Sequence, residues 1–151
     1  YPGGAIASDG TPWTHEGRRL EGDVWPLPAT AYAHPRSAGT FSRFLRIYAR
    51  ERNTLTFMEA IEKASLIPAR ILEDSVPQMK NKGRIRVGAD ADIIVFDPKT
   101  VADRATFEKP AATSIGMLHV VVNGTPVIAN RNLIRKALPG KAIRKSDSSL
   151  R

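Results

Sequence analysis

The chain of 151 residues contains no cysteine, which excludes disulfide bonds and thiolate metal ligands within it. No apolar run approaches the roughly 20 residues that a membrane-spanning helix needs, and no signal peptide opens the chain. We therefore expect a globular protein without a membrane partner. The compartment stays open, with the cytoplasm slightly favoured.

An initiating methionine is also missing, and the opening residues Tyr1-Pro2-Gly3-Gly4 are typical of the interior of a longer protein. A hydrophobic content of 42% and this length would allow one ordinary domain with a sizeable core. We therefore expect a globular segment of a larger polypeptide.

Basic residues outnumber acidic ones by 23 to 15, which gives a net charge of +8. Such a surplus can neutralise the phosphates of a nucleic acid. Here much of it falls on one expected helix and near the end of the chain, without the interleaved aromatic residues that stack on bases. A solvated protein surface explains such charges more simply, so nucleic acid is not expected as a partner.

A short apolar segment near the start, residues 4–7, ends in Ser8-Asp9-Gly10. This pattern favours a strand that gives way to a loop, and functional side chains of parallel α/β sheets lie at the carboxyl ends of strands. Asp9 is therefore a candidate metal ligand or proton carrier. The alternative is an ordinary turn aspartate, which is common before glycine.

Four prolines interrupt residues 11–36, which predicts a long irregular segment. Apolar residues at helical spacing then predict an amphipathic helix over residues 40–52, with Thr40 as its N-cap. Thr56 and Glu59 form a capping box that begins a second helix. Pro68 is placed to begin a third, short helix over residues 68–73.

After residue 83 the hydrophobic period changes to that of strands, which we expect at residues 84–87, 92–97, 118–122 and 126–128. The last two flank Asn123-Gly124, a pair typical of tight hairpins. Asp90 and Asp92 provide too few oxygens for a calcium site and indicate a structural turn. Residues 146–151 are predicted to be a flexible tail.

Five segments resemble, in this order, the C-terminal part of the amidohydrolase superfamily: IASDG, HPRSAGTFSRFL, KGRIRVGADADIIVFDP, TVADRATFEKP and HVVVNGTPVI. Within it they most resemble the N-acyl-D-amino-acid deacylases, or D-aminoacylases. This resemblance implies an α/β fold. Residues 1–80 would be the C-terminal end of a TIM-like (β/α)8 barrel, with its last strand and helices, and residues 81–145 part of a small antiparallel β-sandwich.

The same resemblance implies roles for Asp9 and Arg36. Asp9 would lie beside a zinc ion, take a proton from the metal-bound water as it attacks the amide carbonyl, and later give it to the departing amine. Arg36, on a loop above the barrel mouth, would bind the α-carboxylate of the substrate. Without the resemblance, Arg36 is more simply a surface or loop-bracing arginine. His34 is expected to structure this loop, because a lone histidine makes a poor metal site.

Zn²⁺ is thus the implied cofactor, with Asp9 as one ligand at most and the others expected upstream of this chain. The parent protein would hydrolyse a non-peptide C–N bond, and the expected substrate is an N-acyl-D-amino acid or a related amide. The 151 residues alone would be inactive and would need the remainder of the parent barrel as a partner. The alternative is a non-catalytic β-rich interaction module that kept an amidohydrolase-like tail and binds an acidic partner.

Overall fold

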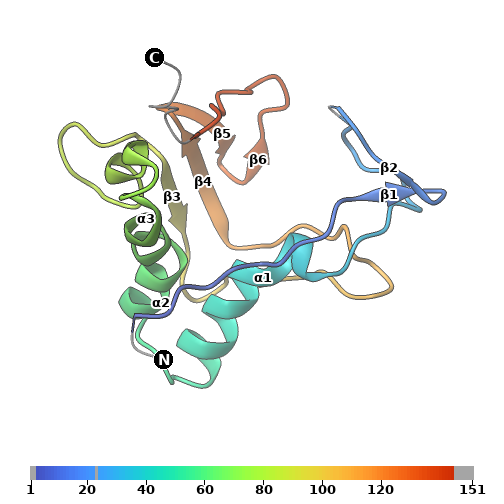
Figure 1. The fold of residues 1–151 in the computed structure, drawn as a ribbon. Helices are drawn as coiled ribbons and strands as arrows, with labels where there is room; N and C mark the ends of the chain where they lie inside the picture. The colour runs from blue at the N-terminus through green and yellow to red at the C-terminus, as the bar shows by residue number, and fades with distance from the viewer. Residues whose placement is uncertain (1–2, 23, 145–151) are drawn as a thin grey trace, which may run out of the picture.

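The computed structural model describes residues 3–22 and 24–144, so the predicted tail at residues 146–151 lies outside the described part. The described residues form a small hairpin, a group of helices and an antiparallel sheet of four strands (Figure 1). Helices and sheet are both present, as the α/β prediction requires. No helix of the described residues has the length and apolarity needed to cross a membrane.

The strand predicted at residues 4–7 is not formed. The backbone N–H of Ile6 instead donates to the carbonyl oxygen of Lys63 at 2.9 Å, so this segment runs along a helix. A strand needs a neighbouring strand to satisfy its backbone groups. Within the described residues, no strand pairs with this segment.

The irregular segment at residues 11–36 contains one small ordered unit. The strands β1 (Thr14–His15) and β2 (Arg18–Arg19) form a hairpin, and Thr14 also pairs with Tyr32 through two backbone hydrogen bonds of 2.9 and 2.8 Å. These bonds fold the segment back on itself before the first helix begins. The remainder is irregular, as predicted.

The first helix begins earlier than predicted. Helix α1 (Arg36–Phe44) has Pro35 as its N-cap and continues directly into the π-helix η1 (Leu45–Glu51). Thr40 lies inside α1, where its hydroxyl donates to the carbonyl oxygen of Arg36 at 2.8 Å, so its prediction as the N-cap is wrong. The apolar stripe located the helix but not its start, because the first turn carries no large apolar side chain.

The capping box is confirmed at the start of α2 (Phe57–Ala64). Glu59 N–H donates to Thr56 Oγ1 at 3.2 Å, and Thr56 N–H donates to the Glu59 carboxylate at 2.7 Å. The bond from the Thr56 backbone, followed by that from its hydroxyl, lowers the pKa of Glu59. Helix α3 (Leu66–Leu72) begins slightly before the expected Pro68, and the 3-10 helix η2 (Pro77–Asn81) was not predicted.

Four antiparallel strands follow in the order β3-β4-β5-β6: β3 (Ile93–Phe96), β4 (Met117–Val122), β5 (Thr125–Ala129) and β6 (Asn132–Leu133). The hairpin turn is confirmed, because Asn123 and Gly124 have φ values of +46° and +77°. The strand predicted at residues 84–87 is wrong. Ile85 and Val87 lie in an irregular segment and are exposed, because no strand of the described chain pairs with them.

The structural turn predicted around Asp90 and Asp92 is confirmed by its contacts. Lys82 Nζ lies 3.0 Å from Asp90 Oδ2 and 2.5 Å from Asp92 Oδ2. Asp92 Oδ1 also accepts the backbone N–H of Asn123 at 2.8 Å, and this bond, together with that from Lys82, lowers the pKa of Asp92. Asp92 therefore fixes the turn to the β4–β5 hairpin, and Lys82 joins the two carboxylates within the turn.

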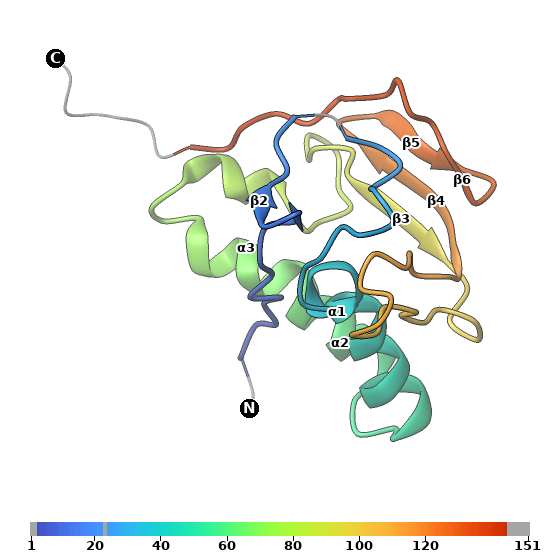
Figure 2. The same cartoon turned by 90° about the vertical axis from the view of Figure 1, so that its right-hand side faces the viewer.

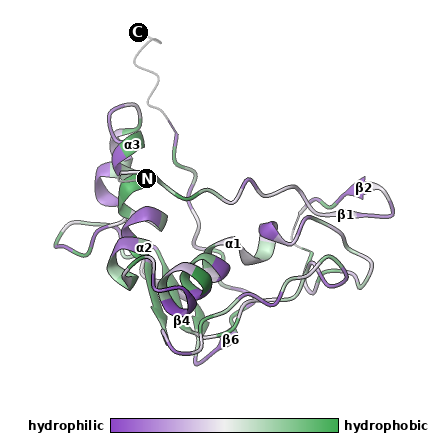
Figure 3. Ribbon diagram, turned by 90° about the horizontal axis from the view of Figure 1, so that it is seen from below, coloured by the Kyte–Doolittle hydropathy of each residue, from purple (hydrophilic) through white to green (hydrophobic). Residues whose placement is uncertain are grey.

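The core lies where the helices meet the sheet. The helices lie together along one side of the sheet in the two views of Figure 1 and Figure 2. Apolar residues gather at this junction, whereas the β1–β2 hairpin is mostly hydrophilic (Figure 3). The buried cluster consists of Phe44, Leu45, Ala49, Ala60 and Val101. It is small for a chain of this length, and β3 exposes three apolar side chains, Ile93, Ile94 and Val95.

Replacement of Gly116 by alanine should test how closely the segment before β4 approaches this core. A Cβ at Gly116 would lie 2.4 Å from the Cα of Val101, whereas at Gly124 it would meet no atom within 4 Å. Both glycines have positive φ, at +85° and +77°. Gly124→Ala should therefore cost about 1–2 kcal/mol through backbone strain alone, and Gly116→Ala about 1–3 kcal/mol more. Urea unfolding followed by circular dichroism measures both, and equal losses would contradict this packing.

Candidate active site

The two residues with predicted functional roles lie in direct contact. Arg36 Nη2 is 3.0 Å from Asp9 Oδ2, and Arg36 Nε donates to the carbonyl oxygen of Asp9 at 2.5 Å. They are 27 residues apart in the sequence. The fold therefore places a carboxylate and a guanidinium side by side.

Asp9 lies in the irregular segment of residues 8–11, called the Asp9 turn below because of its positive φ, and not at the end of a strand. Its φ is +46°, in the left-handed region that aspartate tolerates better than most residues. Its side chain is 87% exposed. This geometry fits the alternative of a turn aspartate, and it also leaves the carboxylate open to any group that approaches from outside this chain.

A second set of bonds holds the Asp9 turn against α1. Thr11 N–H donates to Ser37 Oγ at 2.9 Å, and the Ser37 hydroxyl donates to the carbonyl oxygen of Thr11 at 3.0 Å. Ser37 follows Arg36 directly in the first helical turn. The Asp9 turn and the helix are therefore joined by Thr11 and Ser37 as well as by the Asp9–Arg36 pair. Nothing in the sequence pattern had singled out Ser37.

Arg36 is the first residue of α1, so its predicted position on a loop is wrong. A helix fixes the backbone of this arginine better than a loop would. Its side chain is 37% exposed, and Asp9 uses Nε and Nη2. Among the described contacts, the N–H groups of Nη1 have no partner. Part of the guanidinium fork is therefore available to a ligand carboxylate.

His34 has the loop-structuring role that the sequence predicted. Its Nδ1 accepts the backbone N–H of Arg36 at 3.1 Å. Its ring meets the ring of Phe107 edge-on, with the ring centroids 5.0 Å apart and the planes at 76°. Neither contact involves a second histidine or a carboxylate.

The described residues do not hold a metal ion by themselves. Within residues 3–22 and 24–144, no group of three or more histidine, aspartate or glutamate side chains is placed to bind one. Zinc usually takes four protein or water ligands, and Asp9 offers one carboxylate. The prediction that Asp9 is a zinc ligand therefore depends on ligands from elsewhere.

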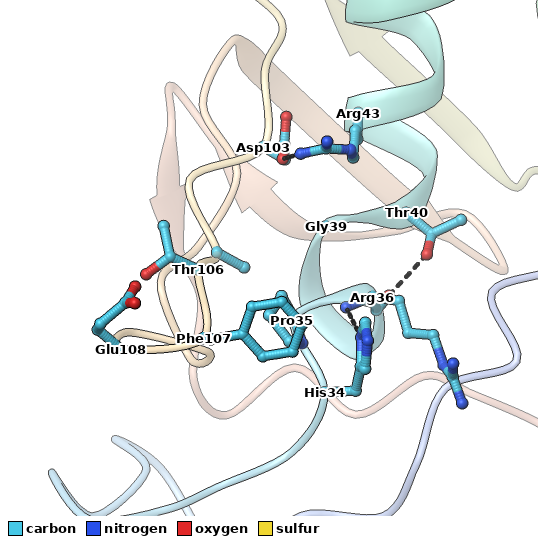
Figure 4. A pocket seen from close by; sticks show the side chains of 11 residues that line it. His34, Pro35, Arg36, Gly39, Thr40, Arg43, Asp103, Thr106, Phe107 and Glu108 are labelled. Carbon is cyan, nitrogen blue, oxygen red and sulfur yellow. Dashed lines mark hydrogen bonds and ion pairs between the residues drawn. The ribbon is translucent and has the colours of Figure 1, made fainter.

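A pocket of about 440 Å³ opens between the first turns of α1 and the segment around residues 103–108 (Figure 4). His34 and Phe107 lie on one side of it, and the side chain of Arg36 points away from Phe107. Arg36 thus borders the pocket, whereas Asp9 is not among the residues that line it.

Asp103, at the edge of this pocket, joins the same segment to α1 and η1. Its side chain is only 6% exposed. It accepts bonds from Arg43 at 3.3 Å and from Arg46 at 3.0 Å. A Cβ at Gly39 would lie 3.1 Å from the Cβ of Asp103, so a side chain there would push the helix and Asp103 apart by a few tenths of an ångström. No local sequence pattern indicates these contacts, because the partners lie 57 to 60 residues away.

Comparison with known proteins places these residues in a wider context. A model described as "Amidohydrolase family" matches residues 22–128, a range that includes Arg36 but not Asp9. The chain is 40% identical over 122 residues to the N-acyl-D-glutamate deacylase of Alcaligenes xylosoxydans xylosoxydans, covering 81% of the chain and 24% of that protein. It is 41% identical over 102 residues to the D-aminoacylase of the same organism, covering 67% of the chain and 20% of that protein.

Solved structures give the same result. The N-acyl-D-glutamate deacylase of Bordetella bronchiseptica, complexed with zinc and a phosphonate that mimics the tetrahedral intermediate, matches with a TM-score of 0.57 and 36% identity over 66% of this chain and 22% of that one. A D-aminoacylase matches with a TM-score of 0.61 and 35% identity, covering 68% of this chain and 20% of that one. The resemblance seen in the sequence is confirmed. The chain spans about a quarter of the length of the first of these relatives.

Removal of the Asp103 charge should loosen the attachment of α1. Asp103→Asn keeps the shape of the side chain but removes the carboxylate that Arg43 and Arg46 share, and Arg46 keeps only its bond to Glu51. We expect a loss of about 1–3 kcal/mol, below the 3–5 kcal/mol of a fully buried pair because Arg43 is exposed. Glu51→Gln is the matched control, since it removes only the more exposed partner of Arg46 and should cost less than about 1 kcal/mol. Urea denaturation measures both, and equal costs would exclude a special role for Asp103.

Proposed function

The chain belongs to the amidohydrolase family, and we propose that the protein containing it is a zinc-dependent hydrolase that cleaves the amide bond of an N-acyl-D-amino acid. The relatives reported above are deacylases of such substrates or D-aminoacylases. The observation that carries the proposal within this chain is the contact between Asp9 and Arg36. It supplies an acid–base group and a carboxylate-binding group at one place.

In this proposal Arg36 binds the α-carboxylate of the substrate. The N–H groups of Nη1 face no acceptor among the described residues, and the bonds to Asp9 hold the other side of the fork. A planar guanidinium held in this way presents parallel N–H donors, which suit a carboxylate. The substrate's amide carbon would then lie on the side of Asp9.

Asp9 is the proposed proton carrier. Its exposed carboxylate can accept a proton and release it to a departing amine within hydrogen-bond reach. Zinc, when bound, would supply an activated water and polarise the amide carbonyl. The described residues do not form a site for this ion. Its remaining ligands are therefore proposed to come from other parts of the protein.

The same parts of the protein are proposed to complete the fold. Residues 1–80 would form the end of a TIM-like barrel, and residues 81–145 part of a β-sandwich. The unpaired segment at residues 4–7 and the exposed apolar residues Ile85 and Val87 support this proposal, since each resembles a strand without its neighbour. The isolated 151 residues are accordingly expected to be inactive.

Two substitutions in the whole protein test these roles. Arg36→Met should lower kcat/KM for N-acyl-D-amino acids by roughly 100-fold, mainly through KM, because a charge-assisted bond to the carboxylate is lost. The same variant should change the hydrolysis of an N-acyl amine without a carboxylate much less. Asp9→Asn should lower kcat by about 10²–10⁴ for both substrates, because proton transfer is lost.

Glu21→Gln, on the exposed loop before α1, is the matched control and should leave both reactions unchanged. Steady-state kinetics with zinc-loaded protein measures each effect. If the whole protein shows no zinc-dependent hydrolysis, the proposal fails and the alternative of a non-catalytic interaction module is favoured. If Asp9→Asn retains full kcat, Asp9 is a turn residue only.

A further inference from the structure

His34 joins the Asp9 turn to the helix that carries Arg36. Its backbone N–H donates to Thr11 Oγ1 at 3.2 Å, its carbonyl oxygen accepts Ser37 N–H at 2.9 Å, and its Nδ1 accepts Arg36 N–H at 3.1 Å. One residue therefore contacts both sides of the candidate site. Because a backbone N–H can only donate, Nδ1 must carry the lone pair in this arrangement.

The imidazole replaces an ordinary helix cap. The N-cap residue of α1 is Pro35, which makes no side-chain hydrogen bond to the helix. The first N–H groups of a helix need external acceptors, which serine, aspartate or asparagine usually supply. Here the ring of His34 supplies one, to the N–H of Arg36 itself. The orientation of the ring thus bears directly on the backbone of the arginine.

Phe107 fixes the orientation of this ring. The two rings meet edge-on, and the ring of His34 lies between Phe107 and the side chain of Arg36 (Figure 4). Phe107 is itself 62% exposed, so its burial contributes less than that of a core aromatic residue. The segment that carries Phe107 is attached to α1 and η1 through Asp103 and its two arginines. The bonds of Asp103 therefore hold the segment of Phe107 in place beside the His34 ring.

We propose that His34 is a positioning residue for Arg36 and that Phe107 holds the His34 ring in place for this purpose. The proposal rests on the function proposed above for Arg36. His34 does not touch the substrate. It holds the backbone N–H of Arg36, and hence fixes the position from which the guanidinium reaches Asp9 and a substrate carboxylate. A displacement of about 1 Å in such a group can cost up to about 100-fold in rate.

The experiment uses the whole protein, an N-acyl-D-amino acid and an N-acyl amine that lacks the carboxylate. His34→Leu, which removes the acceptor, should lower kcat/KM for the first substrate by about 10-fold, mainly through KM. It should change the second by less than about threefold, because only carboxylate binding is disturbed. His34→Asn should restore most of the loss, since asparagine side chains accept the N–H two residues ahead.

A double-mutant cycle with Arg36→Met distinguishes positioning from a general structural role. If His34 acts through Arg36, His34→Leu should cause no further selective loss once Arg36 is gone. His119→Leu is the matched control. It also removes a histidine Nδ1 that accepts a backbone N–H, from Asn130 at 3.4 Å, but it lies on β4 and should leave the ratio of the two substrates unchanged.

The outcomes separate the two proposals. If Arg36→Met itself shows no carboxylate-selective loss, the proposed function of Arg36 and the positioning role both fall. If Arg36→Met is selective but His34→Leu impairs both substrates equally, or adds its full effect to Arg36→Met, only the positioning role is overturned. Should His34→Leu fail to fold, Phe107→Leu decides: a selective loss of about threefold supports the role, and an unselective or absent loss overturns it.

Discussion

The close approach of α1 to the segment around Asp103 is the contact on which the arrangement of this chain depends. Gly39 has no side chain, so the helix can lie directly against Asp103, whose carboxylate is almost fully buried and bonded to two arginines of α1 and η1. A buried carboxylate without these cations would be costly, so the helix and the segment hold each other in place. Arg36 takes its position from the same helix.

The candidate site is fixed on the side of α1 and exposed on the side of Asp9. The Asp9 turn is tied to α1 through Ser37, while the carboxylate of Asp9 itself remains exposed. An exposed ion pair contributes little to stability. The proposed function gives the pair a role in binding and proton transfer instead. The chain spans about a quarter of the length of its relative, in keeping with the proposal that other parts of the protein complete the site.

The elements predicted correctly are those fixed by neighbours in the sequence. Thr56 and Glu59 cap α2 through bonds that span three residues, and Asn123-Gly124 turns the β4–β5 hairpin through its own backbone preference. The strand predictions that failed concern residues 4–7 and 84–87. Their apolar patterns are those of strands, but a strand forms only beside another strand, and within the described residues no strand lies beside either segment.

For the candidate site, too, local sequence and tertiary structure determine different features. The sequence by itself determined the residue types, a carboxylate before a glycine and an arginine after His34-Pro35, and through its resemblance the family to which the chain belongs. Only the tertiary structure decided that Asp9 and Arg36 meet, that Asp103 holds α1, and that the ring of His34 lies against Phe107. These contacts join residues far apart in the chain. They therefore depend on how α1 packs against its neighbours, which local patterns do not encode.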